Sequence, residues 1–565
     1  MLTTSPPTLD RAALAPPSRR ILPATSLADI LLERAETEEG TAFRFLCKDA
    51  MDWTYQDLAA AAGGFAVRLD DRCAVGGRVV LAVEPGPAFV AALFGIMLAG
   101  ATAIPVPAPS GARARARLAT IVADCAPDAI IVEPRQADRV RELTDSGTDV
   151  IAAELRYHTH FATGRPAEPA IVQYTSGSTG DPRGVVLSQD NLLSNCRALH
   201  DAMGWEGDRV GCTWLPPYHD MGLLGAIILA VYGGWPLVVM SPAQFVQRPV
   251  DWLRVIGDHG ATITVAPNFA LDLCVESVPA EEVETLDLSS LRQVYCGAEP
   301  VRAATLRAFE RHFAPAGFRG GVLSPCYGLA EATLFVAGKP VGTAVQVASV
   351  DGVEVASCGR VALAHKVTVV DPRTRRAMPD GVVGEIWVSG PSVAPGYWGH
   401  DTGDATFGAR LDSPDADGRA YLRTGDLGFL RGGELFVSGR IKDVIVVAGR
   451  NLHAHDVERA VHEACPEIRR CAAFAAPTGD GAERLVVAAE IRRKQAPPPE
   501  DLARLRRAVT AAVIAQHGLA PDQVVIVPIG AIQTTTSGKN RRALVRQDFA
   551  AGTLSAFPTS PRRTP

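Results

Sequence analysis

The segment from Tyr174 to Gly184 places hydroxyl side chains next to glycines in an order that suits phosphate binding. It reads Y-T-S-G-S-T-G-D-P-R-G and lies between the apolar stretches 170–172 and 185–187. Glycine lets the backbone turn its N–H groups toward an anion without steric cost, and the hydroxyls add further donors. We therefore expect a strand, a polyphosphate-binding loop and a second strand. The residues expected to contact phosphate are Thr175, Ser176, Gly177, Ser178, Thr179 and Gly180.

Other kinds of Gly/Ser/Thr segment fit this loop less well. An isolated cluster is more often a flexible surface turn, but here a specific order of residues lies between two strand signals. No Gly-Lys-Ser/Thr closes the loop and no helix signal follows it directly, which excludes a Walker A loop. No G-x-S-x-G occurs around Ser178, which excludes a nucleophile elbow.

Three titratable residues elsewhere could take part in binding or catalysis, although none is decisive alone. A carboxylate at Glu331 could hold magnesium, or it could complement the dipole at the start of a helix. Lys539 ends a Ser/Thr/Gly turn, where a lone lysine is usually only solvated. His219 lies between Tyr218 and Asp220, and such a histidine is more often a hydrogen-bonded structural residue than a base.

Taken in order along the chain, these motifs resemble the adenylate-forming superfamily of acyl-CoA synthetases, peptide-synthetase adenylation domains, luciferases and fatty acyl-AMP ligases. The loop matches the pattern T-S-G-S-T-G-x-P-x-G-V, with Arg183 where the superfamily usually has lysine and Gln189 where it often has histidine. The resemblance spans roughly residues 26–550 and is closest to the fatty acyl-AMP ligases. Acyl-CoA synthetases more often carry threonine where this chain has Ala330. The stretches typical of fatty acyl-AMP ligases are W-L-P-P-Y-H-D-M-G-L from Trp214, P-N-F-A-L-D-L-C from Pro267 and P-C-Y-G-L-A-E-A-T from Pro325.

The resemblance implies a role for each matching residue. Asp426 would bind the ribose hydroxyls, Arg440 would contact the nucleotide and Lys442 would be the hinge between two domains. Glu331 would hold the Mg²⁺ bound to ATP, and Lys539 would bridge the substrate carboxylate and the α-phosphate as charge builds. The adenine pocket would be formed by Gly297, Ala298, Glu299, Pro300, Tyr327 and Gly328. The acyl pocket would be bordered by His219, Asp220, Met221, Gly222, Asn268 and Phe269.

Hydrophobic patterning predicts the elements that must position these residues. Strands alternate with helices to about residue 340, which indicates an α/β domain with largely parallel sheets flanked by helices. A β-rich subdomain follows over about 345–440, and a small mobile α+β domain over 441–550. The N-terminal domain therefore covers 26–440, and residues 1–25 and 551–565 are expected to be disordered.

Composition narrows the class of protein further. The chain has 565 residues with 47% hydrophobic and 21% charged, and its net charge of −6 argues against nucleic acid as a partner. Eleven cysteines without metal-site or redox spacing, and no signal pattern, indicate a cytoplasmic protein. The uncharged runs 85–113 and 221–248 contain glycine and proline, so each predicts a buried helix followed by a strand and not a transmembrane segment. Arg113, Arg115 and Arg117 are expected to lie on a solvated helix face.

The predicted function has two half-reactions. ATP would activate a fatty acid to an acyl-adenylate with release of pyrophosphate, and the acyl group would then pass to a phosphopantetheine thiol. Because no carrier domain follows residue 550, the acceptor is expected to be a separate acyl carrier protein. Two alternatives stay open: a fatty acyl-CoA synthetase that uses CoA as acceptor, and a non-catalytic nucleotide-binding protein that kept the fold.

Overall fold

The computed structural model describes residues 25–47, 50–70, 76–144, 147–161, 163–175, 182–350, 353–400, 405–412, 418–447, 450–477, 483–534 and 540–557. Within this part, the chain divides into two compact units. The first takes in Met1–Thr175, Pro182–Thr424 and Gly428–Ser438, and the second takes in Gly425–Leu427 and Gly439–Pro565, as far as they are described.

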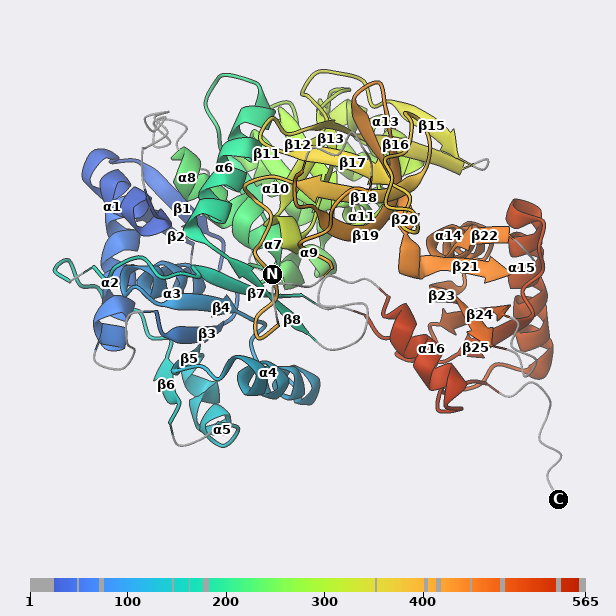
Figure 1. Ribbon diagram of the computed structural model, residues 1–565, viewed down its shortest axis with the longest axis horizontal. Helices are drawn as coiled ribbons and strands as arrows, with labels where there is room; N and C mark the ends of the chain where they lie inside the picture. Colours follow the sequence, from blue (N-terminus) through green and yellow to red (C-terminus); the bar gives the residue numbers. More distant parts are fainter. Residues whose placement is uncertain are drawn as a thin grey trace. The chain divides into compact units, whose positions relative to one another are not determined.

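A six-stranded sheet in the first unit contains β7 and β8, the strands before and after the predicted phosphate loop in the sequence (Figure 1). Its strand order is β6-β5-β3-β4-β7-β8, with every neighbouring pair parallel except β7 and β8. The inner strands β4 and β5 are buried along their whole length, which explains their uninterrupted apolar sequence. The bounds are β3 (Arg78–Ala82), β4 (Thr102–Pro105), β5 (Ala129–Val132), β6 (Asp149–Ala152), β7 (Ile171–Thr175) and β8 (Arg183–Leu187).

A 14-stranded sheet contains a parallel half and an antiparallel half. Its order is β17-β18-β19-β20-β16-β14-β13-β12-β11-β9-β10-β1-β2, with β15 paired to β16. The parallel run consists of β1 (Thr41–Phe45), β10 (Leu237–Val239), β9 (Gly211–Thr213), β11 (Ile263–Pro267), β12 (Gln293–Gly297) and β13 (Leu323–Gly328). The remaining strands are β2 (Met51–Thr54), β14 (Phe335–Gly338), β15 (Val347–Val350), β16 (Val353–Val361), β17 (Lys366–Val370), β18 (Gly384–Ser389), β19 (Leu422–Arg431) and β20 (Glu434–Arg440).

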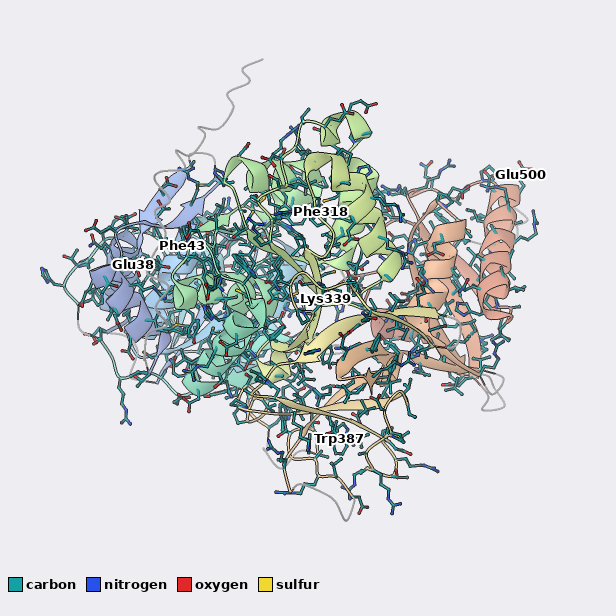
Figure 2. The ribbon with its side chains drawn as sticks, turned by 90° about the horizontal axis from the view of Figure 1, so that it is seen from above. Glu38, Phe43, Phe318, Lys339, Trp387 and Glu500 are labelled. Carbon is teal, nitrogen blue, oxygen red and sulfur yellow. The ribbon has the colours of Figure 1, made fainter. Side chains whose placement is uncertain are left out.

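The α/β class is confirmed, with one difference in the β-rich region. Its strands continue the sheet begun by the parallel strands, because β14 pairs antiparallel with both β13 and β16. Trp387 on β18 is fully buried there (Figure 2). Its ring packs with that of Tyr421.

Two helices begin at capping residues. Ser26 caps α1 by accepting a hydrogen bond from the Asp29 N–H at 3.1 Å, and Ser188 forms a capping box with Asn191 at the start of α6. Both long uncharged runs fold as a helix followed by a strand, as predicted. In the part of the chain described, no helix has the length and apolar character to cross a membrane. The longer helices of this unit are α1 (Leu27–Thr37), α2 (Tyr55–Asp70), α3 (Pro87–Leu98), α4 (Ala112–Cys125), α6 (Gln189–Met203), α10 (Pro249–Asp258), α11 (Asn268–Ser277) and α13 (Ala303–Phe313). The shorter ones are η2 (Pro134–Gln136), α5 (Ala137–Arg141), α7 (Asp220–Gly222), η3 (Leu223–Ile228), α8 (Leu229–Gly233), α9 (Pro242–Gln247), α12 (Ala280–Val283), η4 (Ala314–Ala316) and η5 (Ala330–Ala332).

The second unit is an α+β structure with its own core. A three-stranded sheet of order β23-β24-β25 packs with three helices. Its elements are η6 (Ile441–Asp443), β21 (Val444–Val447), β22 (Arg450–His453), α14 (Ala454–Ala464), β23 (Ile468–Pro477), β24 (Glu483–Ile491), α15 (Pro499–His517), β25 (Gln523–Val527) and α16 (Arg542–Ala550). The structure differs from the expected disorder after residue 550, since Phe557 is buried and its N–H donates to the Ile526 carbonyl at 2.9 Å.

Candidate active site

The parallel half of the large sheet brings together segments that are far apart in the sequence. Strands β9, β11, β12 and β13 are consecutive neighbours and parallel, so their carboxyl ends meet at one edge. The chain leaves these ends into the segments that begin at Trp214, Asn268, Ala298 and Leu329. The four segments predicted to form the adenine and acyl pockets are therefore built at one sheet edge, the usual place for ligands in such folds.

The predicted adenine segment has a constrained backbone. Ala298 adopts a left-handed conformation with φ of 65°, which is uncommon for a residue with a side chain. A Cβ at Gly297 would lie 2.8 Å from the Cys326 Sγ, and a Cβ at Gly328 would lie 1.6 Å from the Leu334 carbonyl oxygen. These glycines allow β12 and β13 to approach their neighbours closely. Tyr327 is buried, with 8% of its surface exposed.

Glu299 and Asn268 connect the adenine segment to the acyl segment. The Glu299 carboxylate accepts a hydrogen bond from the Phe269 N–H at 2.6 Å, in the first turn of α11. Asn268 is fully buried; its amide donates to Thr305 Oγ1 at 3.1 Å and its Oδ1 accepts from the Arg302 N–H at 3.0 Å. The Asn268 carboxamide thus holds the start of α11 in place, and its expected contact with substrate stays a prediction.

The His219 segment is held by its own hydrogen bonds and by strand β7. His219 Nδ1 lies 2.6 Å from Asp220 Oδ1, and the same carboxylate oxygen accepts from the Met221 N–H at 2.8 Å. The Gln173 amide donates to the Tyr218 carbonyl at 2.8 Å, which joins the strand before the phosphate loop to this segment.

Close backbone packing at Gly222 and aromatic stacking at Trp214 hold the predicted acyl segment in place. A Cβ at Gly222 would lie 2.3 Å from the Pro216 carbonyl oxygen, so this turn requires glycine. The chain continues as the π-helical turn η3, a geometry that occurs often at functional sites. The Trp214 ring stacks on Phe245 at 3.8 Å and meets Phe269 edge to face at 6.3 Å, which joins the two predicted acyl segments.

Glu331 lies in η5 and is bound by a residue that the sequence did not indicate. The Tyr397 hydroxyl donates to Glu331 Oε1 at 2.8 Å, and the Arg183 guanidinium lies 5.4 Å from the centre of the Tyr397 ring. Burial and the Glu331 charge both raise the pKa of Tyr397, whereas Arg183 lowers it. Tyr397 also bridges to Val185 on β8. The strand that leaves the phosphate loop is thereby joined to the predicted magnesium ligand.

In the second unit, Asp426 is paired with Arg440. The Arg440 Nε donates to Asp426 Oδ1 at 2.7 Å, and the Asp426 side chain is 6% exposed while that of Arg440 is 54% exposed. These two residues were predicted to hold ribose and nucleotide, and the structure brings them together.

Arg542 is a second residue that the sequence did not indicate. Its guanidinium bonds both oxygens of Glu458, at 2.6 and 2.9 Å, and Asp443 at 2.6 Å, next to the expected hinge Lys442. Burial lowers the pKa of Arg542, but Glu458 and Asp443 together raise it by more, so the net shift is upward. Thr534 and Asn540, which flank the predicted catalytic lysine, are paired in a β-bridge.

Part of the predicted site lies outside the described residues. These are the loop residues Ser176, Gly177, Ser178, Thr179 and Gly180 and the lysine Lys539. Thr175 is described: it ends β7 opposite Arg183 on β8.

Comparison with known proteins decides the family. Residues 32–398 match the AMP-binding enzyme family, and residues 442–558 match the AMP domain of Disco-interacting protein 2-like proteins. The chain belongs to the AMP-binding enzyme family. Its resemblance to the fatty acyl-AMP ligases is also confirmed by individual relatives of this AMP-binding enzyme.

Three of these relatives are similar over nearly the whole chain. The medium-chain-fatty-acid–[acyl-carrier-protein] ligase JamA of Moorena producens is 36% identical, over 94% of this chain and 96% of JamA. FadD21 of Mycobacterium tuberculosis, named as a fatty-acid–CoA ligase, is 35% identical over 93% of this chain and 98% of its own. The crystal structure of a fatty acid AMP ligase from Legionella pneumophila is 32% identical with a TM-score of 0.71, over 95% of this chain and 98% of that one.

Proposed function

We propose that this AMP-binding enzyme activates a fatty acid with ATP and then transfers the acyl group to the phosphopantetheine thiol of a separate acyl carrier protein. The observation that carries the proposal is the meeting of the four substrate and nucleotide segments at one edge of the large sheet. The relative JamA, named as a ligase acting on fatty acid and acyl carrier protein, supports the choice of substrate and acceptor.

In the first half-reaction, a carboxylate oxygen of the fatty acid attacks the α-phosphorus of ATP. The bond from that phosphorus to the bridging oxygen breaks, and pyrophosphate leaves. The phosphate loop would position the polyphosphate, and the Lys539 ammonium would stabilise the charge that builds between carboxylate and α-phosphate. Asp426 would accept hydrogen bonds from the ribose hydroxyls, which suits a carboxylate with two oxygens.

Glu331 is the residue proposed to hold magnesium. Among the described residues, no group of three or more His, Cys, Asp or Glu side chains could hold a metal ion. A single carboxylate fits a magnesium ion that takes its other oxygen ligands from phosphate and water. Mg²⁺, when bound, would neutralise negative charge on the phosphates. The Tyr397 hydroxyl would fix the orientation of the Glu331 carboxylate through its hydrogen bond.

In the second half-reaction, the carrier thiol attacks the acyl carbonyl carbon, the bond to the phosphate oxygen breaks and AMP leaves. We propose that the C-terminal domain turns about Lys442 between the two halves and withdraws Lys539, a hinge motion of a common type.

The direct test is fatty-acid-dependent exchange of labelled pyrophosphate into ATP. Wild-type protein should catalyse it, and Lys539→Ala should lower the rate by about a hundredfold or more, as expected when charge stabilisation in the transition state is lost. Lys494→Ala, at an exposed position of the same unit, is the matched control and should keep the wild-type rate. Exchange by Lys539→Ala at the wild-type rate would refute the mechanism, and no exchange by the wild type would favour a non-catalytic nucleotide-binding protein.

A fatty acyl-CoA synthetase is the second candidate, since the relative FadD21 is named as a fatty-acid–CoA ligase. Both candidates share the first half-reaction and differ in the acceptor. Incubation with ATP, a panel of fatty acids and either CoA or phosphopantetheinylated carrier protein separates them. Efficient formation of acyl-CoA would show that CoA is the acceptor and would refute the carrier-protein proposal.

A further inference from the structure

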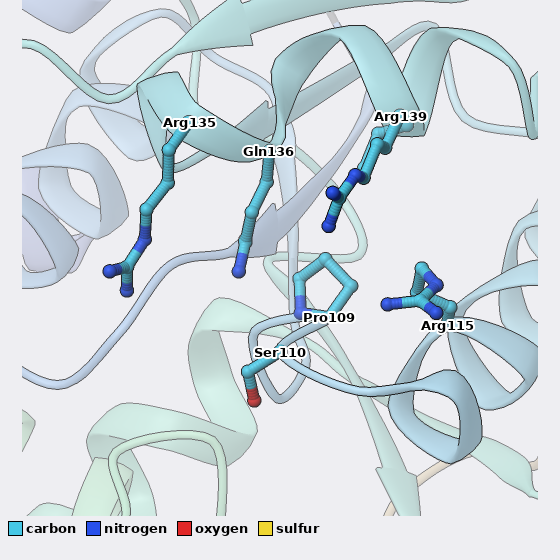
Figure 3. Close-up of a pocket in the computed structure, with 7 residues that line it drawn as sticks. Pro109, Ser110, Arg115, Arg135, Gln136 and Arg139 are labelled. Carbon is cyan, nitrogen blue, oxygen red and sulfur yellow. The ribbon is translucent and has the colours of Figure 1, made fainter.

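An arginine-lined cavity lies at the carboxyl ends of β4 and β5 in the six-stranded sheet. It measures about 410 Å³ and is formed by the loop after β4, the start of α4, and η2 and α5 after β5. Figure 3 shows Gln136 and Arg139 pointing toward Pro109, with Arg115 reaching into the same space. Its lining residues are Pro109, Ser110, Arg115, Arg135, Gln136, Arg139 and Val140.

The topology of this sheet makes the position a natural binding crevice. The chain goes from β3 to β4 on one side and then crosses back to β5 on the other side of β3. The neighbours β3 and β5 therefore send their connections in opposite directions, β3 to β4 and β5 to β6. Such a pair of connections opens a crevice beyond the carboxyl ends of the strands. Here the loops after β3 and β5 are tied together, because the Glu84 N–H donates to the Glu133 carboxylate at 3.3 Å.

The three arginines carry positive charge that the described residues do not neutralise. Within that part of the chain, the guanidiniums of Arg115, Arg135 and Arg139 make no ion pair or hydrogen bond. The nearby carboxylates are engaged elsewhere: Asp138 pairs with Arg141 at 2.5 Å and Glu133 accepts the Glu84 N–H. A guanidinium presents N–H donors in a planar fork that matches phosphate oxygens.

The Gln136 amide gives a second, independent indication of a binding site. Its Oε1 is buried and, among the described residues, has no hydrogen-bond partner. Buried polar atoms are nearly always paired in native proteins, so an orphan in a cavity points to a group that binds there. With the amide rotated by half a turn, its NH₂ would donate to an anion beside the arginines.

We propose that this cavity binds a phosphate group, with Arg115, Arg135 and Arg139 as its counter-ions and the Gln136 amide as a neutral donor. Two sources share this chemistry: the phosphate of a phosphopantetheine arm, a choice that rests on the proposed function, and free inorganic phosphate. The sequence suggested only a solvated arginine face for α4, whereas Arg115 is half-buried in the cavity wall.

Titration calorimetry on the full chain tests the proposal with 4′-phosphopantetheine, pantetheine and inorganic phosphate. The wild type should bind 4′-phosphopantetheine about tenfold more tightly than pantetheine, as expected for charge-assisted bonds to one phosphate. The double variant Arg135→Gln/Arg139→Gln should abolish that difference. Arg311→Gln, at an exposed position of the same unit and outside the cavity, is the matched control.

Each outcome decides the question. Arginine-dependent binding of 4′-phosphopantetheine supports the site with the arm as its source, and arginine-dependent binding of inorganic phosphate alone supports it with free phosphate as the source. Equal behaviour of the wild type and the double variant, whether both bind these ligands or neither does, overturns it. Pyrophosphate exchange should be unchanged in the double variant, so a failure of this proposal is distinguishable from a failure of the proposed function, in which the wild type itself shows no exchange.

Discussion

The Tyr397 hydroxyl donates a hydrogen bond of 2.8 Å to Glu331, across 66 positions of sequence. The Arg183 guanidinium lies over the same ring, and Arg183 is the first residue of β8, the strand that follows the phosphate loop. Tyr397 therefore connects the proposed magnesium ligand to the strand that positions the polyphosphate.

Tyr397→Phe should raise the Mg-ATP concentration needed for half-maximal pyrophosphate exchange by about tenfold. The reason is that a hydrogen bond to a charged group contributes about 1.5 kcal/mol or more. Calorimetric titration of Mg-ATP provides a readout apart from activity. Tyr157→Phe, at an exposed position, is the control. A Tyr397→Phe protein that reached half-maximal exchange at the wild-type Mg-ATP concentration would contradict the positioning role.

Gly328→Ala should destabilise the first unit and abolish adenylate formation. The added Cβ would lie 1.6 Å from the Leu334 carbonyl oxygen, a backbone atom that cannot move away alone. Overpacking of this kind typically costs about 1–3 kcal/mol. Thermal unfolding should report a lower Tm for Gly328→Ala. Gly320→Ala has open space around its Cβ and should keep the wild-type Tm, so equal effects of the two variants would be inconsistent with a steric cause.

We expect Glu299 to position Phe269 by accepting its N–H hydrogen bond, and its negative charge to have no role of its own. Glu299→Ala removes the acceptor for the Phe269 N–H, so we expect a rise of about fivefold in the KM for fatty acid, in line with about 1 kcal/mol per hydrogen bond. Glu299→Gln keeps an acceptor oxygen and should stay within about twofold of wild type. If both variants lost activity equally, the negative charge would have a role of its own, and the positioning role would be wrong.

Arg542→Gln should destabilise the packing of α14 and α16 in the second unit. It would leave the buried Glu458 carboxylate without its strongest partner, and removing one member of a buried ion pair costs about 3 kcal/mol or more. Hydrogen exchange over α14 and α16 should increase. Arg546→Gln is the matched control, because Arg546 is about half exposed and lies 4.0 Å from Glu483. Unchanged protection of α14 in Arg542→Gln would show that the network does not hold these helices.

The sequence predicts the elements of this fold better than the contacts between them. The alternation of apolar runs predicts the parallel strands, and the Ser/Gly motif is correctly expected between two strands. No local sequence pattern marks Tyr397 as a site residue. Its hydrogen bond to Glu331 could not be predicted, because it depends on how β8 and η5 pack together. The motif of Glu299 suggests the adenine pocket, and it does not reveal that the carboxylate also accepts a hydrogen bond from the first turn of α11. Long-range hydrogen bonds depend on the assembled sheet edge, which no spacing in the sequence encodes.

His365 should make the stability of the first unit depend on pH. Among the described residues neither of its ring nitrogens has a hydrogen-bond partner, and burial lowers its pKa from 6.5 to about 4. The folded state therefore favours the neutral imidazole, while the unfolded chain takes up a proton below pH 6.5. Stability contributed by the neutral ring is fully present above pH 6.5 and is lost as the pH falls toward 4, by up to on the order of 3 kcal/mol.

Urea unfolding followed by tryptophan fluorescence measures this effect, because all 7 tryptophans precede residue 400 and report on the first unit. The urea midpoint of the wild type should fall between pH 7 and pH 5 more steeply than that of His365→Leu, which has no proton to gain at this position. His160→Leu, at an exposed position, should keep the wild-type slope. Equal pH dependence in wild type and His365→Leu would mean that the imbalance in proton uptake arises from other residues.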